Sequence, residues 1–276
     1  MMIELPEARV YAEQLQQALA ADTVVRCVAG AHPHKMAFYE GDPQHYPDLL
    51  EGGSVQDCRA WGGLVELCTT KAHLLVGDGV RLRLLDPGDT RPDKHQLQLV
   101  FASGRVLTAS IQMYGGIWVY LPETFNNPYY RTAKEKPSPL SDAFDSAYWN
   151  QFLAGQRSSL SMKALLATEQ RIPGLGNGVL QDILWHGGLH PKAKLMDLTP
   201  ANADKLYAAI KETLQAMVSQ GGRSTEQNLW GEPGGYPVQL SARTSGKPCP
   251  ACSTAIESLH YMGGRVYFCP SCQPVP

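Results

Sequence analysis

The segment Cys249-Pro250-Ala251-Cys252 is followed, after residues 253–268, by Cys269-Pro270-Ser271-Cys272. A CxxC turn presents two thiolates to one metal ion, and a second CxxC closes the site from the other side of a hairpin. Four thiolates leave no open coordination position, so the ion would stabilise the fold rather than activate water. We therefore predict a zinc-ribbon hairpin with one structural Zn²⁺ per chain. Its predicted ligands are Cys249, Cys252, Cys269 and Cys272.

Two disulfide bonds or a redox-active CxxC are the alternatives for this cysteine cluster. The chain has seven cysteines, and an odd number without a secretion leader is not typical of a disulfide scaffold. No charged segment followed by an apolar run opens the sequence. The cysteines therefore favour an intracellular metal site. A zinc ribbon does not by itself define a function, because such modules also mediate protein contacts.

Upstream of the ribbon the sequence has helical periodicity. Ser161–Gln170 and Gly178–His186 are predicted helices on either side of the glycine-rich turn Ile172–Gly178. Thr199-Pro200 is typical of a helix start, and the apolar stripe that follows ends at Gly221-Gly222. The residues of this stripe are Leu206, Ile210, Leu214 and Met217. The glycine-rich turn could expose backbone amides to a phosphate, although most such turns bind nothing.

The N-terminal half has a different pattern. One amphipathic helix is predicted over Leu5–Ala20, and short apolar runs broken by Gly, Pro and Asp then continue to about Tyr120. Alternation on both sides of the Ser103-Gly104 turn indicates a β-hairpin. We therefore predict the α+β class, with a β-sandwich domain that carries an opening helix and a C-terminal helical bundle with the ribbon. The predicted boundaries are 1–121 for the sandwich, 122–142 for a linker, 143–239 for the bundle and 240–276 for the ribbon.

The overall charge does not suggest a nucleic-acid partner. The net charge is −2 and the sequence pI is near 6.4, whereas dedicated nucleic-acid binders usually carry a basic excess. The tail from Leu240 is locally basic, and binding depends on where charge lies rather than on its sum. No apolar run approaches the roughly 20 residues that span a bilayer. We expect a soluble, cytoplasmic monomer with no membrane partner.

Five motifs of the C-terminal half keep a common order and spacing with a known family. They are Met162-Lys163-Ala164-Leu165-Leu166, Pro173-Gly174-Leu175-Gly176-Asn177, His190-Pro191, Gln220-Gly221-Gly222 and Gly264-Arg265-Val266-Tyr267-Phe268-Cys269-Pro270-Ser271-Cys272-Gln273. This half closely resembles the bacterial formamidopyrimidine-DNA glycosylase and endonuclease VIII family. The piece Pro137–Asp142 is similar as well, and the similarity continues more faintly to the first residue.

This resemblance implies a function in base excision repair of DNA. It implies a helix-two-turns-helix module for the helical bundle, and duplex DNA with an abasic or damaged site as the partner. Members of the family are DNA glycosylases with an associated lyase activity. In them, the residues that match Lys163, Asn177 and Arg265 grip the phosphates that flank a flipped-out nucleotide.

The N-terminus departs from the family at its catalytic residue. Family members begin Met-Pro-Glu-Leu-Pro-Glu, and the proline amine exposed by removal of the initiator attacks the sugar C1′ to form a Schiff base. This chain reads Met2-Ile3-Glu4-Leu5-Pro6-Glu7, so Ile3 stands where the nucleophile belongs. An internal amide nitrogen is not a nucleophile, because its lone pair is delocalised. Glu4 keeps the position of the acid-base carboxylate, although a first-turn glutamate can also simply favour the helix dipole.

Other positions of the N-terminal half differ as well. A family lysine that contacts the lesion or its phosphate aligns with Trp61. Asp78 and Gly115 stand near positions where bulkier residues would fill the void left by a flipped base, and Met113 is the one plausible wedge.

Three functions remain open from the sequence. The first is a glycosylase and lyase that uses a different N-terminal amine. The second is a damaged-DNA-binding protein that recognises an abasic or flipped-out nucleotide without Schiff-base catalysis. The third is a zinc-ribbon module for protein contacts. Retention of Lys163, Asn177 and Arg265 favours the first two, and the loss of the proline and lysine favours the second.

Overall fold

The computed structural model describes residues 2–275, and Met1, which bears on the predicted mature N-terminus, lies outside them. The chain divides into two compact units, each described here by itself. Unit 1 comprises the residues up to Arg131 together with Gly221–Gly235, and unit 2 comprises Thr132–Gln220 with the residues from Tyr236 onward. This division places Gly221–Gly235 with the N-terminal residues, whereas the sequence grouped it with the helical bundle.

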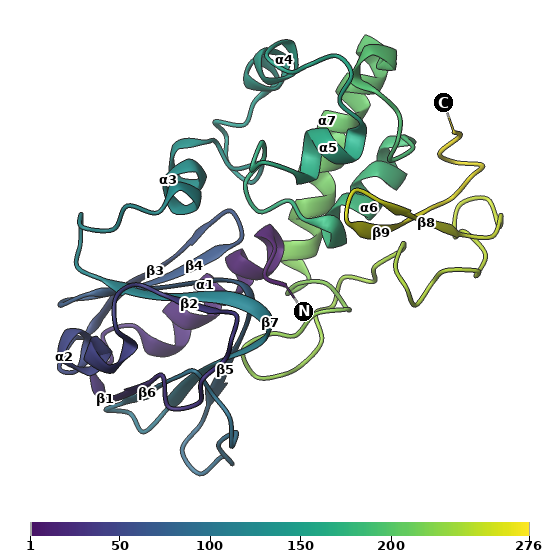
Figure 1. Cartoon of the computed structure of the whole chain (residues 1–276). Coiled ribbons are helices and arrows are strands. Elements are labelled where there is room, and N and C mark those ends of the chain that lie inside the picture. The colour runs from purple at the N-terminus through teal and green to yellow at the C-terminus, as the bar shows by residue number, and fades with distance from the viewer. Residues whose placement is uncertain (1, 276) are drawn as a thin grey trace. The chain divides into compact units, whose positions relative to one another are not determined.

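Unit 1 is an α+β body built on one mixed sheet (Figure 1). Its elements in chain order are α1 (Leu5–Leu19), β1 (Val24–Ala29), β2 (Ala37–Tyr39), the 3-10 helix η1 (Pro43–His45), α2 (Tyr46–Leu50), β3 (Val55–Trp61), β4 (Leu64–Thr69), β5 (His73–Leu85), β6 (Leu97–Phe101) and β7 (Val106–Tyr120). The predicted Ser103-Gly104 turn joins β6 to β7, and Gly104 takes the positive φ of 84° that this tight connection needs.

The seven strands form one hydrogen-bonded sheet rather than two separate sheets. The order is β1-β6-β7-β5-β4-β3, and β2 adds to β7 in parallel. The long strands β5 and β7 pair over most of their length, with a register shift between Asp78 and Val80. Such a shift bends the strands and increases their twist, so one sheet can supply both sides of a core.

Helix α1 packs against β3 and β4 and completes this core. Its apolar side chains recur at helical spacing, and Tyr11, Leu15 and Leu19 are buried in the same cluster as the inward residues of the strands. Pro6 lies in the first turn, where a missing N–H costs nothing. The predicted opening helix is therefore confirmed.

The segment Gly221–Gly235 is held on unit 1 by both side chains and backbone. The Leu84 amide donates to the Leu229 carbonyl at 2.9 Å, and the Leu229 amide donates to the Gln14 side chain at 3.2 Å. Arg83 donates from Nη1 to the Asn228 carbonyl at 2.8 Å. These contacts join residues far apart in sequence, which explains why chain order alone did not place the segment.

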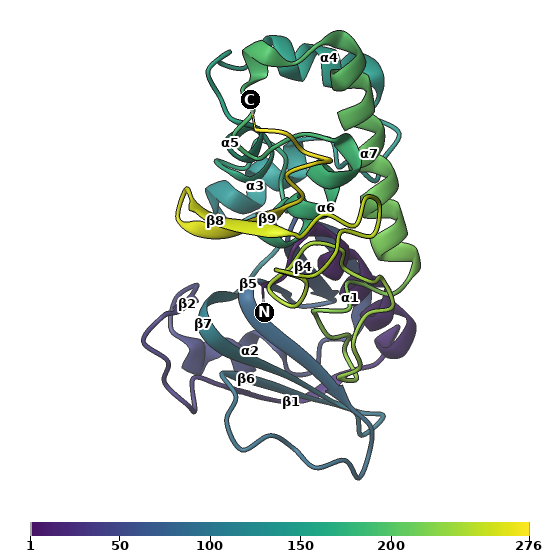
Figure 2. The same cartoon turned by 90° about the vertical axis from the view of Figure 1, so that its right-hand side faces the viewer.

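Unit 2 is helical with a terminal hairpin (Figure 2). Its elements are α4 (Ser146–Ala154), α5 (Met162–Ala167), α6 (Asn177–Gly187), the 3-10 helix η2 (Leu195–Asp197), α7 (Pro200–Ser219), β8 (Glu257–Tyr261) and β9 (Gly264–Phe268). The side chain of Thr199 accepts from the Asn202 amide and so caps α7 as predicted. The four residues of the predicted stripe on α7 are fully buried.

Helix α3 (Pro128–Glu135) lies within residues 122–142, which the sequence analysis assigned to a linker without naming a helix there. Asn127 accepts from the amides of Tyr129 and Tyr130 through its side chain, and Pro128 occupies the first helical position. Both are ordinary helix-start signals. They were missed because the following turns have no apolar stripe to identify them. The boundary between the two units falls within α3.

The β8–β9 hairpin packs on α6 within unit 2. Phe268 contacts the ring of His190 edge-on, with centroids 4.6 Å apart. Gln273 is fully buried and donates to the Leu189 carbonyl at 2.8 Å. The His190 and Gln273 motifs noted in the sequence therefore attach the ribbon to the helices. Among the described residues, no helix is both long enough and apolar enough to span a membrane.

Candidate functional site

Lys163 lies in the first turn of α5, where Ser161 caps the helix. Its Nζ donates to the Tyr261 carbonyl of β8 at 2.6 Å, and burial lowers the pKa of its ammonium group. A lysine at a helix N-terminus opposes the helix dipole. The position therefore does not favour the local stability of α5, which is expected where a positive charge has a binding role.

Asn177 is the first residue of α6, and it follows the predicted glycine-rich turn. Its Nδ2 donates to the Arg265 carbonyl at 2.7 Å, while its Oδ1 is a buried acceptor with no hydrogen-bond partner among residues 2–275. Gly176 precedes it as the N-cap and supplies no side-chain acceptor. The side chain therefore joins the start of α6 to the ribbon hairpin.

Arg265 is exposed on β9, two residues after the turn at Gly263. It stands in the strand, and its cross-strand neighbour is His260. Its Nη2 donates to His260 Nε2 at 2.9 Å. This contact orients the guanidinium while leaving it accessible.

These three residues meet around Gly264 in unit 2. A Cβ atom at Gly264 would lie 3.5 Å from Lys163 Nζ and 3.7 Å from Asn177 Nδ2. Arg265 is the next residue along the strand. One ammonium, one amide and one guanidinium are thus gathered on adjoining elements, a set of donors suited to the oxygens of successive phosphates.

The four C-terminal cysteines also come together in unit 2, and they could hold a metal ion. Cys252 Sγ lies 3.4 Å from the sulfur atoms of both Cys269 and Cys272, and Cys249 Sγ lies 3.9 Å from that of Cys272. Tetrahedral coordination with metal–sulfur bonds of about 2.3 Å separates sulfur atoms by roughly 3.8 Å, whereas a disulfide needs about 2.05 Å. The arrangement fits a tetrahedral ion, and all four thiols are unbridged.

Ile3 is a buried core residue in unit 1, with 4% of its surface exposed. Its nitrogen is a peptide amide that donates to the Asp78 carbonyl at 2.8 Å. Asp78 takes a positive φ of 60° there. Because the nitrogen is both amide and hydrogen-bonded, it cannot attack a sugar carbon.

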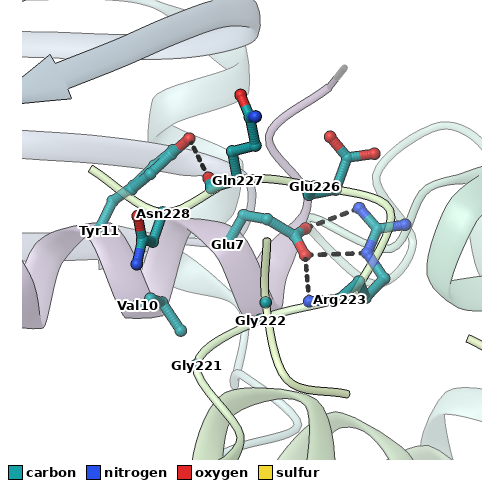
Figure 3. Close-up of a pocket in the computed structure, with 10 residues that line it drawn as sticks. Glu7, Val10, Tyr11, Gly221, Gly222, Arg223, Glu226, Gln227 and Asn228 are labelled. Atoms are coloured by element: carbon teal, nitrogen blue, oxygen red, sulfur yellow. Dashed lines mark hydrogen bonds and ion pairs between the residues drawn. The ribbon is translucent and has the colours of Figure 1, made fainter. Parts of the chain in front are cut away.

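Glu4 is the N-cap of α1 and forms an ion pair with a buried arginine. Its Oε2 lies 3.5 Å from Nη1 of Arg223. Arg223 also donates from Nε and Nη2 to the two carboxylate oxygens of Glu7, at 2.8 and 2.7 Å. Figure 3 shows this bidentate pair beside the start of α1. Glu4 is therefore part of a charge cluster and is not only a favourable helix-start residue.

Trp61, which the resemblance led us to expect in place of a family lysine, is held by a second buried carboxylate. Its Nε1 donates to Glu66 Oε2 at 2.7 Å. The other oxygen of Glu66 accepts from Tyr120, from Tyr130 at 2.7 Å and from His73 at 3.0 Å. Burial alone would raise the pKa of Glu66, but these donors hold it at about 2. Trp61 is thus fixed as a structural residue of unit 1.

The residues near the positions expected to fill the void left by a flipped base differ in their place in the sheet and in their exposure. Asp78 and Gly115 are cross-strand partners on β5 and β7, so both are constrained by the sheet. Met113 is 67% exposed on β7. Of the three residues, Met113 alone presents a large apolar side chain to solvent.

Sequence reasoning missed Arg223, Glu226 and Glu66. Arg223 directly follows the Gly221-Gly222 helix stop, and it contacts Glu7 across 216 positions of sequence. No spacing rule reaches over that distance. The one local signal was an arginine and a glutamate soon after the Gly221-Gly222 helix stop, in residues that the sequence analysis grouped with the helical bundle.

Comparisons with known proteins identify relatives of the chain. The model of the formamidopyrimidine-DNA glycosylase H2TH domain matches residues 136–228. The chain is 30% identical to formamidopyrimidine-DNA glycosylase of Pasteurella multocida (strain Pm70) over 202 residues, which cover 72% of this chain and 73% of the relative. It is 27% identical to that of Shouchella clausii (strain KSM-K16) over 285 residues, which cover both chains completely.

Solved structures share the fold over nearly the whole chain. The Lactococcus lactis Fpg, solved with DNA that contains an abasic site, superposes with a TM-score of 0.84 at 22% identity and covers 99% of this chain and 100% of its own. The MutM (Fpg) protein of Thermus thermophilus superposes with a TM-score of 0.81 at 23% identity and covers 98% of each chain. Together with the sequence matches, these likenesses show that the chain belongs to the formamidopyrimidine-DNA glycosylase and endonuclease VIII family.

Proposed function

We propose that the protein binds duplex DNA and recognises an abasic or flipped-out nucleotide, without forming a Schiff base through residue 3. The observation that carries this proposal is Ile3, whose amide nitrogen is hydrogen-bonded to Asp78 within the protein core. At this position the protein therefore has no amine nucleophile for the Schiff-base reaction of the family.

The donors gathered around Gly264 support the binding half of the proposal. Lys163, Asn177 and Arg265 lie on three elements of unit 2 and offer cationic and amide donors close to one another. Contacts of this kind fix the register of a protein on DNA without reading sequence. A net charge of −2 does not prevent such binding, because the contacts depend on the local set of donors.

Fluorescence anisotropy tests the binding proposal with a duplex that contains one tetrahydrofuran abasic analogue and the same duplex without it. We expect tighter binding to the abasic duplex, with an affinity that falls as salt rises because phosphate contacts release counterions. Absence of binding to either duplex at low salt would contradict the proposal.

We also propose that the ion held by the four cysteines is zinc, one per chain, in a structural role. Four thiolates suit Zn²⁺, and they leave no position for a reacting water. The ion would fix the base of the hairpin that carries Arg265, because Cys269 directly follows β9.

Elemental analysis of protein purified without chelators checks this second proposal. The expected value is one zinc per chain. Replacement of Cys252 by Ser should reduce the value, whereas replacement of Cys27, a buried cysteine outside the cluster, should leave it unchanged. Metal-free wild-type protein would contradict the assignment.

A further inference from the structure

A cluster of side chains on β4 and β5 of unit 1 combines three types of metal ligand. Glu66, Cys68 and His73 place a carboxylate oxygen, a sulfur and an imidazole nitrogen within 4.8 Å of one another. Glu66 and Cys68 are buried, with 1% and 2% of their surfaces exposed. The side chain of His73 is 18% exposed, so an ion can reach the cluster from the side of the imidazole.

The pairing of β4 with β5 brings the three residues together. Cys68 and His73 are directly opposite partners in the ladder. Glu66 precedes Cys68 by two residues, so the two side chains point to the same face of the sheet. The turn between the strands is fixed by Thr69, whose amide and hydroxyl both donate to the Ala72 carbonyl, at 3.0 and 2.7 Å. The positions of the ligands are therefore set by the sheet rather than by a long loop.

The distances within the cluster fit one tetrahedral ion. Cys68 Sγ lies 3.6 Å from His73 Nδ1. Bonds of about 2.3 Å to sulfur and about 2.05 Å to nitrogen separate these two atoms by about 3.6 Å at a tetrahedral ion. His73 Nδ1 lies 3.0 Å from Glu66 Oε1, and the same ion would hold a nitrogen and a carboxylate oxygen about 3.4 Å apart. Only this contact has to widen when an ion enters.

The carboxylate of Glu66 is held in place by neutral donors around the cluster. Trp61 Nε1 donates to Oε2 at 2.7 Å. The hydroxyls of Tyr130, at 2.7 Å, and of Tyr120 donate to Oε1. Hydrogen bonds of this kind orient a metal ligand and increase its affinity for the ion. The charged partner of Glu66 is His73, which is cationic only when it is protonated.

A divalent ion would complete this arrangement. One carboxylate and one thiolate neutralise its two positive charges, and a site of zero net charge can be buried at low cost. The ion would replace the hydrogen bond between His73 and Glu66, so Oε1 would keep the same number of partners. Thiolate and imidazole ligands suit zinc rather than magnesium or calcium.

We propose that Glu66, Cys68 and His73 bind a second zinc ion, with the fourth tetrahedral position open to water. This inference goes beyond the proposed function, because it involves neither DNA nor the ribbon. Three protein ligands and a displaced hydrogen bond make the site weaker than the four thiolates of the ribbon. The second ion therefore exchanges with the solution and leaves during dialysis, whereas the ribbon keeps its ion.

The test begins with wild-type protein dialysed until one zinc per chain remains. Equilibrium dialysis against increasing concentrations of Zn²⁺ then measures further binding. We expect one additional zinc per chain to bind with a saturating curve. If no second zinc has bound when free zinc reaches the millimolar range, the inference is overturned.

The substitution Cys68→Ser removes the sulfur ligand with little change in size. We expect affinity for the second zinc to fall by at least about 100-fold, the upper end of the loss seen for outer-shell partners alone. Cys27→Ser is the matched control, because Cys27 is a buried cysteine outside the cluster, and it should leave the affinity unchanged. Retention of the ribbon zinc shows that each variant is folded. A second zinc that binds Cys68→Ser as tightly as wild type lies elsewhere and overturns the inference.

Cobalt identifies the ligands directly in the wild-type protein, without reliance on a variant. Co²⁺ added to protein that keeps its ribbon zinc should give the intense thiolate-to-cobalt charge-transfer band of a sulfur ligand. The band should appear in Cys27→Ser and be absent from Cys68→Ser. Cobalt binding without this band in wild-type protein shows that sulfur is not a ligand and overturns the inference. An equal band in Cys68→Ser places the cobalt in the ribbon and overturns it as well.

Discussion

Glu66 shows how a single buried residue couples stability to pH. Four donors hold its pKa at about 2, below the ordinary value of 4.5. The folded state therefore binds fewer protons than the unfolded state. The resulting stabilisation is present above pH 4.5 and is lost as the pH falls from about 4.5 to about 2. Its size is about 3 kcal/mol, taking roughly 1.36 kcal/mol for each pH unit.

Replacement of Glu66 by Gln should remove this contribution. We expect the free energy of unfolding at pH 7 to fall by about 3 kcal/mol, and the difference from wild type to narrow toward pH 3. Denaturant titrations between pH 7 and pH 3 measure the loss of stability and its dependence on pH. Glu13→Gln is the control, because Glu13 is an exposed partner of Arg9 and should change stability by less than about 1 kcal/mol. A difference that does not depend on pH would contradict the role given to Glu66.

Arg265 is the exposed arginine that we propose contacts a phosphate of the DNA. The substitution Arg265→Ala should weaken binding to abasic duplex by about 1.5–3 kcal/mol, the usual value for a hydrogen bond to a charged group. Anisotropy measures the change. Arg243→Ala removes another exposed arginine of the same basic tail and should have a clearly smaller effect. Equal losses for the two variants would indicate general electrostatic attraction instead.

Residue 3 can be tested by restoring the family nucleophile. Ile3→Pro, made with Met1 deleted so that removal of Met2 exposes the proline amine, should form a borohydride-trapped complex on abasic DNA. Holding reactants together can lower a barrier by about 7–11 kcal/mol, but only where a nucleophile is present. Ile3→Pro with Met1 retained is the matched control and should give no complex. If both variants are silent, Trp61 or the altered loops also block the reaction.

At the scale of elements, the local signals of capping and periodicity predicted most of what the structure shows. The cap at Thr199, the stripe on α7 and the opening helix were all readable, because each depends on neighbouring residues. Helix α3 was not predicted, since its start signal at Asn127 precedes no apolar stripe. The glycine-rich turn predicted the start of α6 to within one residue.

The ribbon is the element whose shape should depend on metal. Removal of the ion by a chelator should disorder the β8–β9 hairpin and weaken binding to abasic DNA, because Arg265 lies on that hairpin. Anisotropy before and after chelation, followed by addition of Zn²⁺, measures the loss and its recovery. If protein shown to be metal-free bound abasic DNA with unchanged affinity, DNA binding would not depend on the metal-held shape of the ribbon, and the prediction would be contradicted.

At the scale of the whole molecule, sequence reasoning could not predict contacts between residues that lie far apart in the chain. The resemblance placed Lys163, Asn177 and Arg265 in one set, and the structure brings them around Gly264. It did not reveal that Arg223 would join Glu4 and Glu7, since the partners lie near opposite ends of the chain. The altered N-terminus was visible in the sequence as Ile3. The charge cluster beside it became visible only when Gly221–Gly235 was seen to fold onto unit 1.

Borohydride trapping of the wild-type protein on an abasic duplex tests the central claim most directly. Binding is first established by anisotropy on the same duplex, so that a negative result cannot come from absent DNA. The account predicts a stable complex with no covalent band, because the nitrogen of Ile3 is an amide bonded to Asp78. A covalent band from unmodified protein, lost in Glu4→Gln and so not due to a contaminating lyase, would contradict it.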